Sequence, residues 1–207
     1  MSVRASLFAM TYDRQMRKTE ANGLRAFRQR LLADATGQVI EIGGGTGANL
    51  PLYGPAVDSV IITEPLRPML KRLEQRVRDQ GSGAKVLRAP AEDLPFDDGT
   101  FDVAVSTLVL CGVDDQPRAL RELRRVLRPG GRLLFLEHVR YDDPKDARLQ
   151  DRLNWLNRLV VCCDCNRATL ASIKQAGFTV TQLERSRIPG APKFVGPAIM
   201  GAAVTPS

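Results

Sequence analysis

The sequence predicts an α/β fold, a seven-stranded mostly parallel sheet with helices on both faces. Three observations support this prediction. Short apolar runs alternate with helical patterns along the chain, a glycine-rich turn follows the first of these runs, and the hydrophobic content of 43% is that of an ordinary globular protein. Strands that alternate with helices form parallel sheets covered on both faces. At 207 residues the chain can bury one substantial core, so we expect a single domain spanning residues 1–207.

The expected strands are the short apolar runs. They cover residues 38–42, 59–63, 85–88, 102–106, 132–138 and 179–183, with a last strand near residues 199–204. The helical patterns between them cover residues 12–33, 68–79, 116–127, 147–161 and 167–175. Pro68 stands near one helix start and Gly81 beyond its end, and Pro129-Gly130-Gly131 follows the next helix.

The net charge of +7 raises the question of a nucleic-acid partner. Much of the charge lies in two amphipathic segments, "RPMLKRLEQRVRDQ" and "PRALRELRRVLRP". The apolar stripe of the second is formed by Leu120, Leu123, Val126 and Leu127. Arginines occupy the remaining face, as on a solvated helix. Because aromatic residues make up only 5% of the chain and do not interleave with basic ones, we expect no nucleic acid partner.

Two classes of protein are disfavoured by the composition. No apolar run approaches the roughly 18 residues that a membrane span needs, so we expect no membrane span. Arg4 and Asp13 interrupt the N-terminal segment, which does not resemble a secretory signal, and we expect a cytoplasmic protein.

Three of the four cysteines stand in "CCDC", and the only histidine is His138. Reduced, packed thiols are therefore favoured over a structural metal site.

The stretch "VIEIGGGTGANLPLY", residues 39–53, places four glycines within five positions. Glycine lets a ligand approach backbone amides, because it has no side chain to block them. Ligands of such sheets bind beyond the carboxyl ends of the strands. The residues that this rule gathers around one crevice are Gly43, Gly45, Gly47, Glu64, Ala91, Glu92, residues 106–110 and His138.

Two nucleotide cofactors fit this loop. Gly43-x-Gly45-x-x-Ala48, with Glu64 about twenty residues on, matches the dinucleotide fingerprint. However, Glu41 in the preceding strand would repel a pyrophosphate, and the chain is short for a second nucleotide-binding half. Glu41 suits an amino group or a positive centre, and Glu64 can accept hydrogen bonds from both ribose hydroxyls. S-adenosyl-L-methionine, an amino acid joined to adenosine through a sulfonium, matches both and is the predicted cofactor.

Four ordered segments resemble a known family. "VIEIGGGTGANLPLY", "AEDLPFDDGTFDVAVSTLVL", "RALRELRRVLRPGGRLLFLEHV" and "GFTVTQLERSRIP" are similar to class I methyltransferases of the ubiquinone/menaquinone-methyltransferase-like superfamily (methyltransferase domain type 11). The resemblance implies the Rossmann-like class I methyltransferase fold. A closer likeness, in "STLVLCGV", the Trp155 region and "VGPAIMGAAV", is to alkyl thiol S-methyltransferases. This chain lacks the N-terminal anchoring helix of those animal proteins, so we do not expect membrane attachment to carry over.

The resemblance also implies a set of cofactor-binding residues. These are Glu41, Gly43, Gly45, Gly47, Asn49, Glu64, Pro65, Ala91, Glu92, Thr107 and Leu108. Glu41 and the glycines are expected near the methionine part, Glu64 at the ribose, and Ala91 and Glu92 along the adenine. Pro90 stands where many relatives have an aspartate that holds the adenine amine, so adenine recognition is expected to rest on Glu92 or on backbone groups.

His138, at the end of the fifth expected strand, is the candidate general base, because histidine titrates near neutrality. The alternative is a structural hydrogen-bonding role. Its neighbour Glu137 is expected to point to the opposite face and to be structural. Tyr12 and Asp13 match the "YD" of the family and are expected in a helical lid, residues 1–33, over the reacting methyl group.

Residues 142–166 are expected to form a helical substrate cap. Leu149, Leu153, Leu156 and Val160 make an apolar stripe that either faces the site or is an ordinary buried helix face, with Trp155 nearby. Asn166 and Arg167 either contact the substrate or start the next helix. Cys111 is expected to be a small packing residue, and Asp114 and Asp115 to cap a helix.

We predict a methyltransferase that acts on a small hydrophobic molecule. Methyl transfer requires in-line alignment and exclusion of water. A thiol, with a pKa of about 8.5, needs little activation, and the subgroup resemblance makes it the preferred acceptor. The alternatives are C- or O-methylation of a quinone or natural-product ring and N-methylation of a lipid head group. A non-catalytic cofactor-binding module is the alternative from another class. The oligomeric state stays open between monomer and homodimer.

Overall fold

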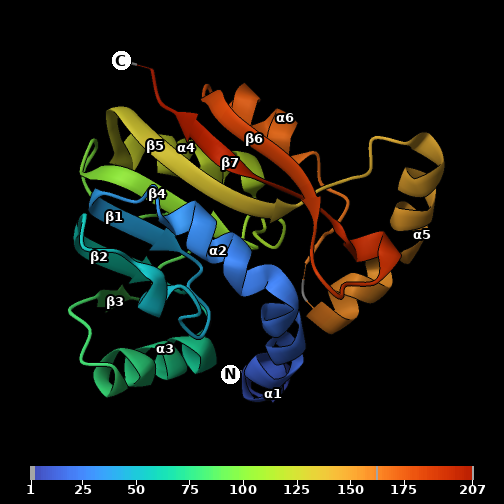
Figure 1. The fold of residues 1–207 in the computed structure, drawn as a ribbon, viewed down its shortest axis with the longest axis horizontal. Helices are drawn as coiled ribbons and strands as arrows, with labels where there is room; N and C mark the ends of the chain where they lie inside the picture. The colour runs from blue at the N-terminus through green and yellow to red at the C-terminus, as the bar shows by residue number, and fades with distance from the viewer. Residues whose placement is uncertain (1–2, 162, 207) are drawn as a thin grey trace.

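The computed structural model describes residues 3–161 and 163–206. Its centre is a seven-stranded sheet with the order β3-β2-β1-β4-β5-β7-β6 (Figure 1). The strands are β1 (Gly37–Ile42), β2 (Val57–Thr63), β3 (Lys85–Leu87), β4 (Phe101–Thr107), β5 (Leu127–His138), β6 (Thr179–Arg187) and β7 (Pro197–Val204). β7 pairs antiparallel with β5 and β6, and the other neighbours pair in parallel. The predicted seven-stranded, mostly parallel sheet is confirmed.

Helices cover both faces of the sheet. The helical segments are α1 (Val3–Thr19), η1 (Glu20–Leu24), α2 (Arg25–Leu32), η2 (Leu50–Leu52), α3 (Arg67–Asp79), α4 (Gln116–Val126), α5 (Pro144–Val161), α6 (Thr169–Gln175) and η3 (Lys193–Val195). Side chains alternate between the two faces along each strand. Val39 of β1 packs in the core that contains Leu31 of α2, whereas Ile40 packs with Leu120 of α4 and Ile173 of α6.

The N-terminal segment differs from the single helix predicted over residues 12–33. Helical structure already begins at Val3, and a non-helical turn breaks it at Gly23, which has a φ of 134°. A Cβ at Gly23 would lie 3.2 Å from Pro189 Cγ, so glycine permits a close approach of the chain that leads into β7. On the N-terminal side of this kink, α1 lies beside α3 rather than on the sheet (Figure 1).

The fifth strand also begins earlier than predicted. Leu127 pairs with Phe101, and pairing resumes with Arg132 opposite Val103, so residues 128–131 form a bulge. Gly130 adopts a φ of 74° within it, a conformation that favours glycine. The glycines that were expected only to end a helix therefore lie inside an irregular strand.

The apolar stripe predicted on residues 147–161 is not buried as a unit. Leu149 is 45% exposed and Trp155 is 65% exposed. α5 packs beside η3 at one side of the sheet, which leaves much of its surface to solvent (Figure 1). The alternative of an ordinary buried helix face is therefore wrong for Leu149, which does not line the cavity described below either, and the side chain of Val160 lies outside the described residues.

Two features are absent from residues 3–161 and 163–206. Among these residues no helix is long and apolar enough to cross a membrane. The same part of the chain contains no group of three or more His, Cys, Asp or Glu side chains arranged to hold a metal ion. Cys162, the first residue of the "CCDC" run, lies outside the described residues.

Candidate functional site

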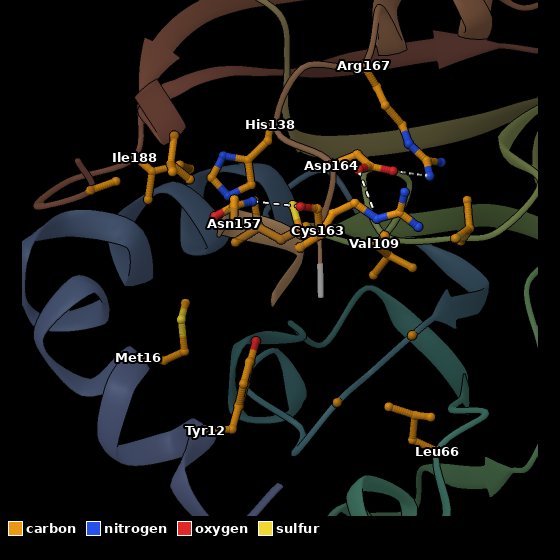
Figure 2. Close-up of a pocket in the computed structure, with 18 of the residues that line it drawn as sticks. Tyr12, Met16, Leu66, Val109, His138, Asn157, Cys163, Asp164, Arg167 and Ile188 are labelled. Carbon is orange, nitrogen blue, oxygen red and sulfur yellow. Dashed lines mark hydrogen bonds and ion pairs between the residues drawn. The ribbon is translucent and has the colours of Figure 1, made fainter. Parts of the chain in front are cut away.

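A cavity of 1530 Å³ lies at the carboxyl ends of the parallel strands. Its walls come from the loops after β1, β2, β3 and β4, the end of β5, helices α1 and α5, and the segment between β6 and β7. His138, Asn157 and Cys163 lie on one wall, and Tyr12 and Met16 lie on the opposite wall (Figure 2). This is the position at which open α/β sheets bind ligands.

The glycine loop after β1 forms the floor of one end of the cavity. Gly43, Gly45 and Gly47 have φ values of 56°, 58° and 84°, which favour glycine. A Cβ at Gly43 would lie 2.6 Å from Val109 Cγ1, so this glycine also permits tight packing. At Gly45 no atom lies within 4 Å of the added Cβ, and Gly45 lines the cavity. The loop therefore leaves open space against its backbone, as a bound nucleotide requires.

Glu64 follows β2 directly and faces the same end of the cavity. The residue is only 4% exposed. Its two carboxylate oxygens accept backbone hydrogen bonds, Oε2 from Gly45 N at 2.9 Å and Oε1 from Leu66 N at 2.8 Å. Burial raises the pKa of Glu64 to about 7, although the two backbone bonds oppose this shift. A carboxylate held here can accept hydrogen bonds from a ribose.

Glu41 lies beneath the loop rather than in the cavity wall. It accepts hydrogen bonds from Tyr53 Oη at 2.6 Å and Asn49 Nδ2 at 3.0 Å, and burial raises its pKa. Asn49 also donates to Thr107 Oγ1. Arg28 of α2 donates to Asn49 Oδ1 at 3.0 Å and to Thr107 Oγ1 at 2.7 Å. Glu41, Asn49 and Thr107, which were predicted, thus form a buried network with Arg28 and Tyr53, which were not, and this network supports the loop from below.

The far end of the cavity is bounded by the loops after β3 and β4. Ala91 and Glu92 line it, as does Pro90. Glu92 Oε1 accepts hydrogen bonds from the backbone nitrogens of Asp114 at 2.9 Å and Asp115 at 3.2 Å, so its carboxylate is already engaged. Asp115 caps α4, because its side chain accepts a hydrogen bond from the Arg118 amide at 2.9 Å.

His138 lies on the wall opposite Tyr12 (Figure 2). It is 8% exposed, and burial lowers its pKa to about 4 against the opposing effect of backbone bonds with Val195 and Pro197. Nδ1 is the one buried side-chain nitrogen or oxygen, among the residues that the structure describes, without a hydrogen-bond partner. The imidazole is therefore neutral, and the residue lines the cavity while its Nδ1 is buried against the protein.

The remaining predicted site residues fall into two groups. Trp155, Arg167 and Leu108 line the cavity, and Leu108 is the one described non-glycine residue with a positive φ, at 61°. Asn166 points elsewhere and donates to Asp151 Oδ1 at 2.9 Å. Asp13 ties α1 to the glycine loop through Thr46 Oγ1 at 2.5 Å. Glu137 accepts hydrogen bonds from Ser106 and from the amides of residues 109–111, which agrees with its predicted structural role.

Several cavity residues were not predicted. The missed wall consists of Leu66, Met69, Gly112, Val113, Ile188, Gly190, Ala191, Pro192, Phe194 and Val195. The segment between β6 and β7 is the largest part of this set, and it joins the cavity because β7 inserts between β5 and β6. The antiparallel return of β7 brings its leading loop to the carboxyl end of β5. Only knowledge of that strand order would have identified the segment.

Comparison with known proteins gives matches over most of the chain. Residues 40–135 match a family model described as a methyltransferase domain. The chain is 36% identical to thiol S-methyltransferase TMT1B from Homo sapiens, over 96% of its own length and 84% of that protein. It is 37% identical to the ubiquinone/menaquinone biosynthesis C-methyltransferase UbiE from Idiomarina loihiensis, over 61% of this chain and 53% of that one.

Solved structures share the fold. Geranyl diphosphate C-methyltransferase from Streptomyces coelicolor, in complex with S-adenosyl-L-homocysteine, matches with a TM-score of 0.69 at 15% identity. The match covers 87% of this chain and 77% of that one. The seven-stranded architecture is therefore that of a known group of enzymes.

Proposed function

The chain belongs to the class I S-adenosylmethionine-dependent methyltransferases, and from this premise we propose that its methyl acceptor is the sulfur of a small hydrophobic thiol. The protein is a methyltransferase that uses S-adenosyl-L-methionine. The observation that carries the proposed acceptor is the neutral imidazole of His138 in a part of the cavity wall that also contains Met16, Ile188 and Phe194. The likeness to proteins named as thiol S-methyltransferases agrees with it.

The residues at the glycine-loop end fit the cofactor. The bound cofactor would supply an electrophilic methyl group on a sulfonium sulfur. The open backbone at Gly45 would lie against its methionine part, and Glu64 would accept the ribose hydroxyls. Ala91 would lie along the adenine, with backbone groups providing recognition because Glu92 is already bonded to other amides. Glu41 would act through Asn49 and Tyr53 rather than by contact.

The opposite end fits a thiol. Met16, Ile188 and Phe194 line it, and such side chains exclude water from a reacting sulfur. The neutral imidazole of His138 would hydrogen-bond the thiol as it enters and align the sulfur with the methyl group, and the thiol would release its proton to solvent before the transfer. A nitrogen with a pKa of about 4 is a weak base, so we propose a positioning hydrogen bond in place of the general base expected from the sequence. Thiols ionise readily enough to need no stronger base.

Two segments complete the proposal. Residues 1–33 would act as a lid, through Tyr12 and Met16, and residues 142–166 as a substrate cap, through Trp155 and Leu156. We also propose that the protein is cytoplasmic and that its methyl acceptor is a small molecule.

A panel of matched acceptors tests the thiol. The purified protein is incubated with labelled S-adenosylmethionine and with thiol, phenol and quinol versions of the same ring, and the products are identified by mass spectrometry. We expect S-methyl thioether and little product from the phenol. The variant Glu64→Ala, which removes the proposed ribose contact, controls for background methylation.

Three results would contradict the proposal that the methyl acceptor is a thiol. Preferential C-methylation of the quinol would favour the activity in the name of the Idiomarina relative. Preferential methylation of the phenol would make the protein an O-methyltransferase. Cofactor binding without product from any acceptor would favour a non-catalytic module.

A further inference from the structure

Two cysteine sulfurs meet at the wall of the cavity. Cys111 Sγ and Cys163 Sγ lie 3.1 Å apart, although the residues are far apart in sequence. Cys111 follows β4 and is fully buried. Cys163 follows α5, is half-buried and lines the cavity on the same wall as His138 (Figure 2). One thiol of the pair is therefore open to a small molecule, and the other lies directly behind it.

The backbone holds this pair together. Asp164 N donates to the carbonyl oxygen of Cys111 at 2.8 Å, and Asn157 Nδ2 donates to the carbonyl oxygen of Cys163 at 2.7 Å. Cys111 N in turn donates to Glu137 Oε2 at 3.3 Å. The contact with Cys163, together with burial, raises the pKa of the Cys111 thiol well above its usual value. The accessible Cys163 is thus the sulfur suited to attack first.

We propose that Cys111 and Cys163 are a redox-active dithiol that reduces small organic disulfides entering the acceptor end of the cavity. The class of disulfide rests on the proposed function: a cavity that admits small hydrophobic thiols also admits the disulfides that these thiols form. Reduction would release the acceptor thiol at the place where it is methylated.

The exchange balances without another reactant. Cys163 Sγ attacks one sulfur of the disulfide R–S–S–R, the S–S bond breaks, and one thiol R–SH leaves with the proton that Cys163 gave up. Cys111 Sγ then attacks Cys163 Sγ in the mixed disulfide and displaces the second R–SH, which takes the proton of Cys111. The disulfide is reduced to two thiols, and the two cysteines are oxidised to one protein disulfide.

Cys165 is not part of this pair. It is fully buried, and its sulfur lies 3.4 Å from Asn154 Oδ1. With Cys162, Cys111 and Cys163 it completes the four cysteines of the chain. The double variant Cys162→Ser/Cys165→Ser therefore leaves only the proposed dithiol and provides the background for the test.

The test uses dithiodipyridine, which releases a coloured thiopyridone at each exchange step. In the double-variant background we expect two equivalents of thiopyridone per chain, no retained adduct, and a peptide map that links Cys111 to Cys163. Adding Cys111→Ser should leave one equivalent and a stable adduct on Cys163. Adding Cys163→Ser should leave Cys111 reduced. Circular dichroism and cofactor affinity, unchanged in each variant, serve as checks of folding.

Retention of a stable adduct in the background protein, or a link between other residues, would overturn the dithiol. A second arm adds S-adenosylmethionine and the symmetric disulfide of a small hydrophobic thiol, with no other reductant. We expect up to two methylated thioethers per chain, and none from Cys111→Ser/Cys163→Ser. Exchange without methylated product would support the dithiol and contradict the thiol acceptor. Methylation of the free thiol without exchange would do the reverse.

Discussion

The carboxyl group of Glu64 shows how one residue can make cofactor binding depend on pH. Burial raises its pKa to about 7, so the free protein holds a proton there at pH 6 and has lost it by pH 8. Only the carboxylate accepts hydrogen bonds from both ribose hydroxyls. We therefore expect the Kd for S-adenosylmethionine to fall about tenfold between pH 6 and pH 8.

Calorimetric titration at several pH values measures this dependence. Glu64→Gln removes the titrating group but keeps the shape of the side chain, so it should bind more weakly and with little dependence on pH between 6 and 8. A wild-type Kd that stays constant over this range would show that the proton on Glu64 plays no part in binding.

His138 provides a second prediction at the scale of one residue. Because its pKa is lowered to about 4, the imidazole is neutral throughout the range in which the enzyme is assayed. The kcat/KM for a thiol should follow the ionisation of the thiol and show no step near pH 6.5. His138→Phe should lower kcat/KM about tenfold, the value of one lost hydrogen bond, and leave the cofactor Kd unchanged.

The matched variant His138→Gln places an amide oxygen near the outer edge of the imidazole and should retain part of the activity. The measurement is a pH profile of kcat/KM for the wild type and both variants. A step near pH 6.5 that disappears in both variants would mean that His138 titrates during the reaction, in conflict with its burial.

At the scale of elements, α1 is joined to the cofactor loop by few contacts. Asp13 accepts a hydrogen bond from Thr46 Oγ1 at 2.5 Å and pairs with Arg76 Nη2 at 3.3 Å. The side chains of Asp13 and Arg76 are partly exposed, so their ion pair contributes little stability. Asp13→Ala should therefore leave the thermal unfolding temperature nearly unchanged. It should weaken the binding of S-adenosylmethionine about threefold to tenfold, because one or two hydrogen bonds typically contribute a free energy of that size.

Hydrogen exchange gives a direct readout of the same contact. The amides of α1 should exchange faster in Asp13→Ala, while those of the central strands should not change. Arg14→Ala, at the neighbouring exposed position, is the matched control. Equal cofactor affinity in both variants would remove the proposed lid role of this helix.

The sequence predicted where the helices and strands lie along the chain better than it predicted how deeply their side chains are buried and what they pack against. The strands were found because each is a short apolar run, and the glycine loop because its spacing is distinctive. The family resemblance placed Asn49 and Thr107 at the cofactor but could not distinguish a cavity wall from the layer beneath it, where their side chains bond to each other. The kink at Gly23 could not be predicted, since it lies against Pro189 of a distant segment. The wall formed by residues 190–192, 194 and 195 could not be predicted either, because it depends on the strand order.

At the scale of the whole molecule, the cofactor site joins several parts of the fold. The cavity is formed by the N-terminal helix, the ends of the central strands, α5 and the segment before β7. A ligand bound there contacts segments that are distant in sequence, and it binds only when they are assembled. Binding to the native state alone stabilises a protein by mass action.

Thermal unfolding with added nucleotides tests this coupling and the identity of the cofactor together. At about one hundred times the Kd, S-adenosylmethionine should stabilise the protein by about 2.7 kcal/mol, which for a domain of this size raises the unfolding temperature by about 5–10 °C. NAD at the same concentration should cause no shift, because no second nucleotide-binding half is present in the described seven-stranded fold. Glu64→Ala should lose most of the response. A larger shift with NAD than with S-adenosylmethionine would contradict the assignment of the glycine loop.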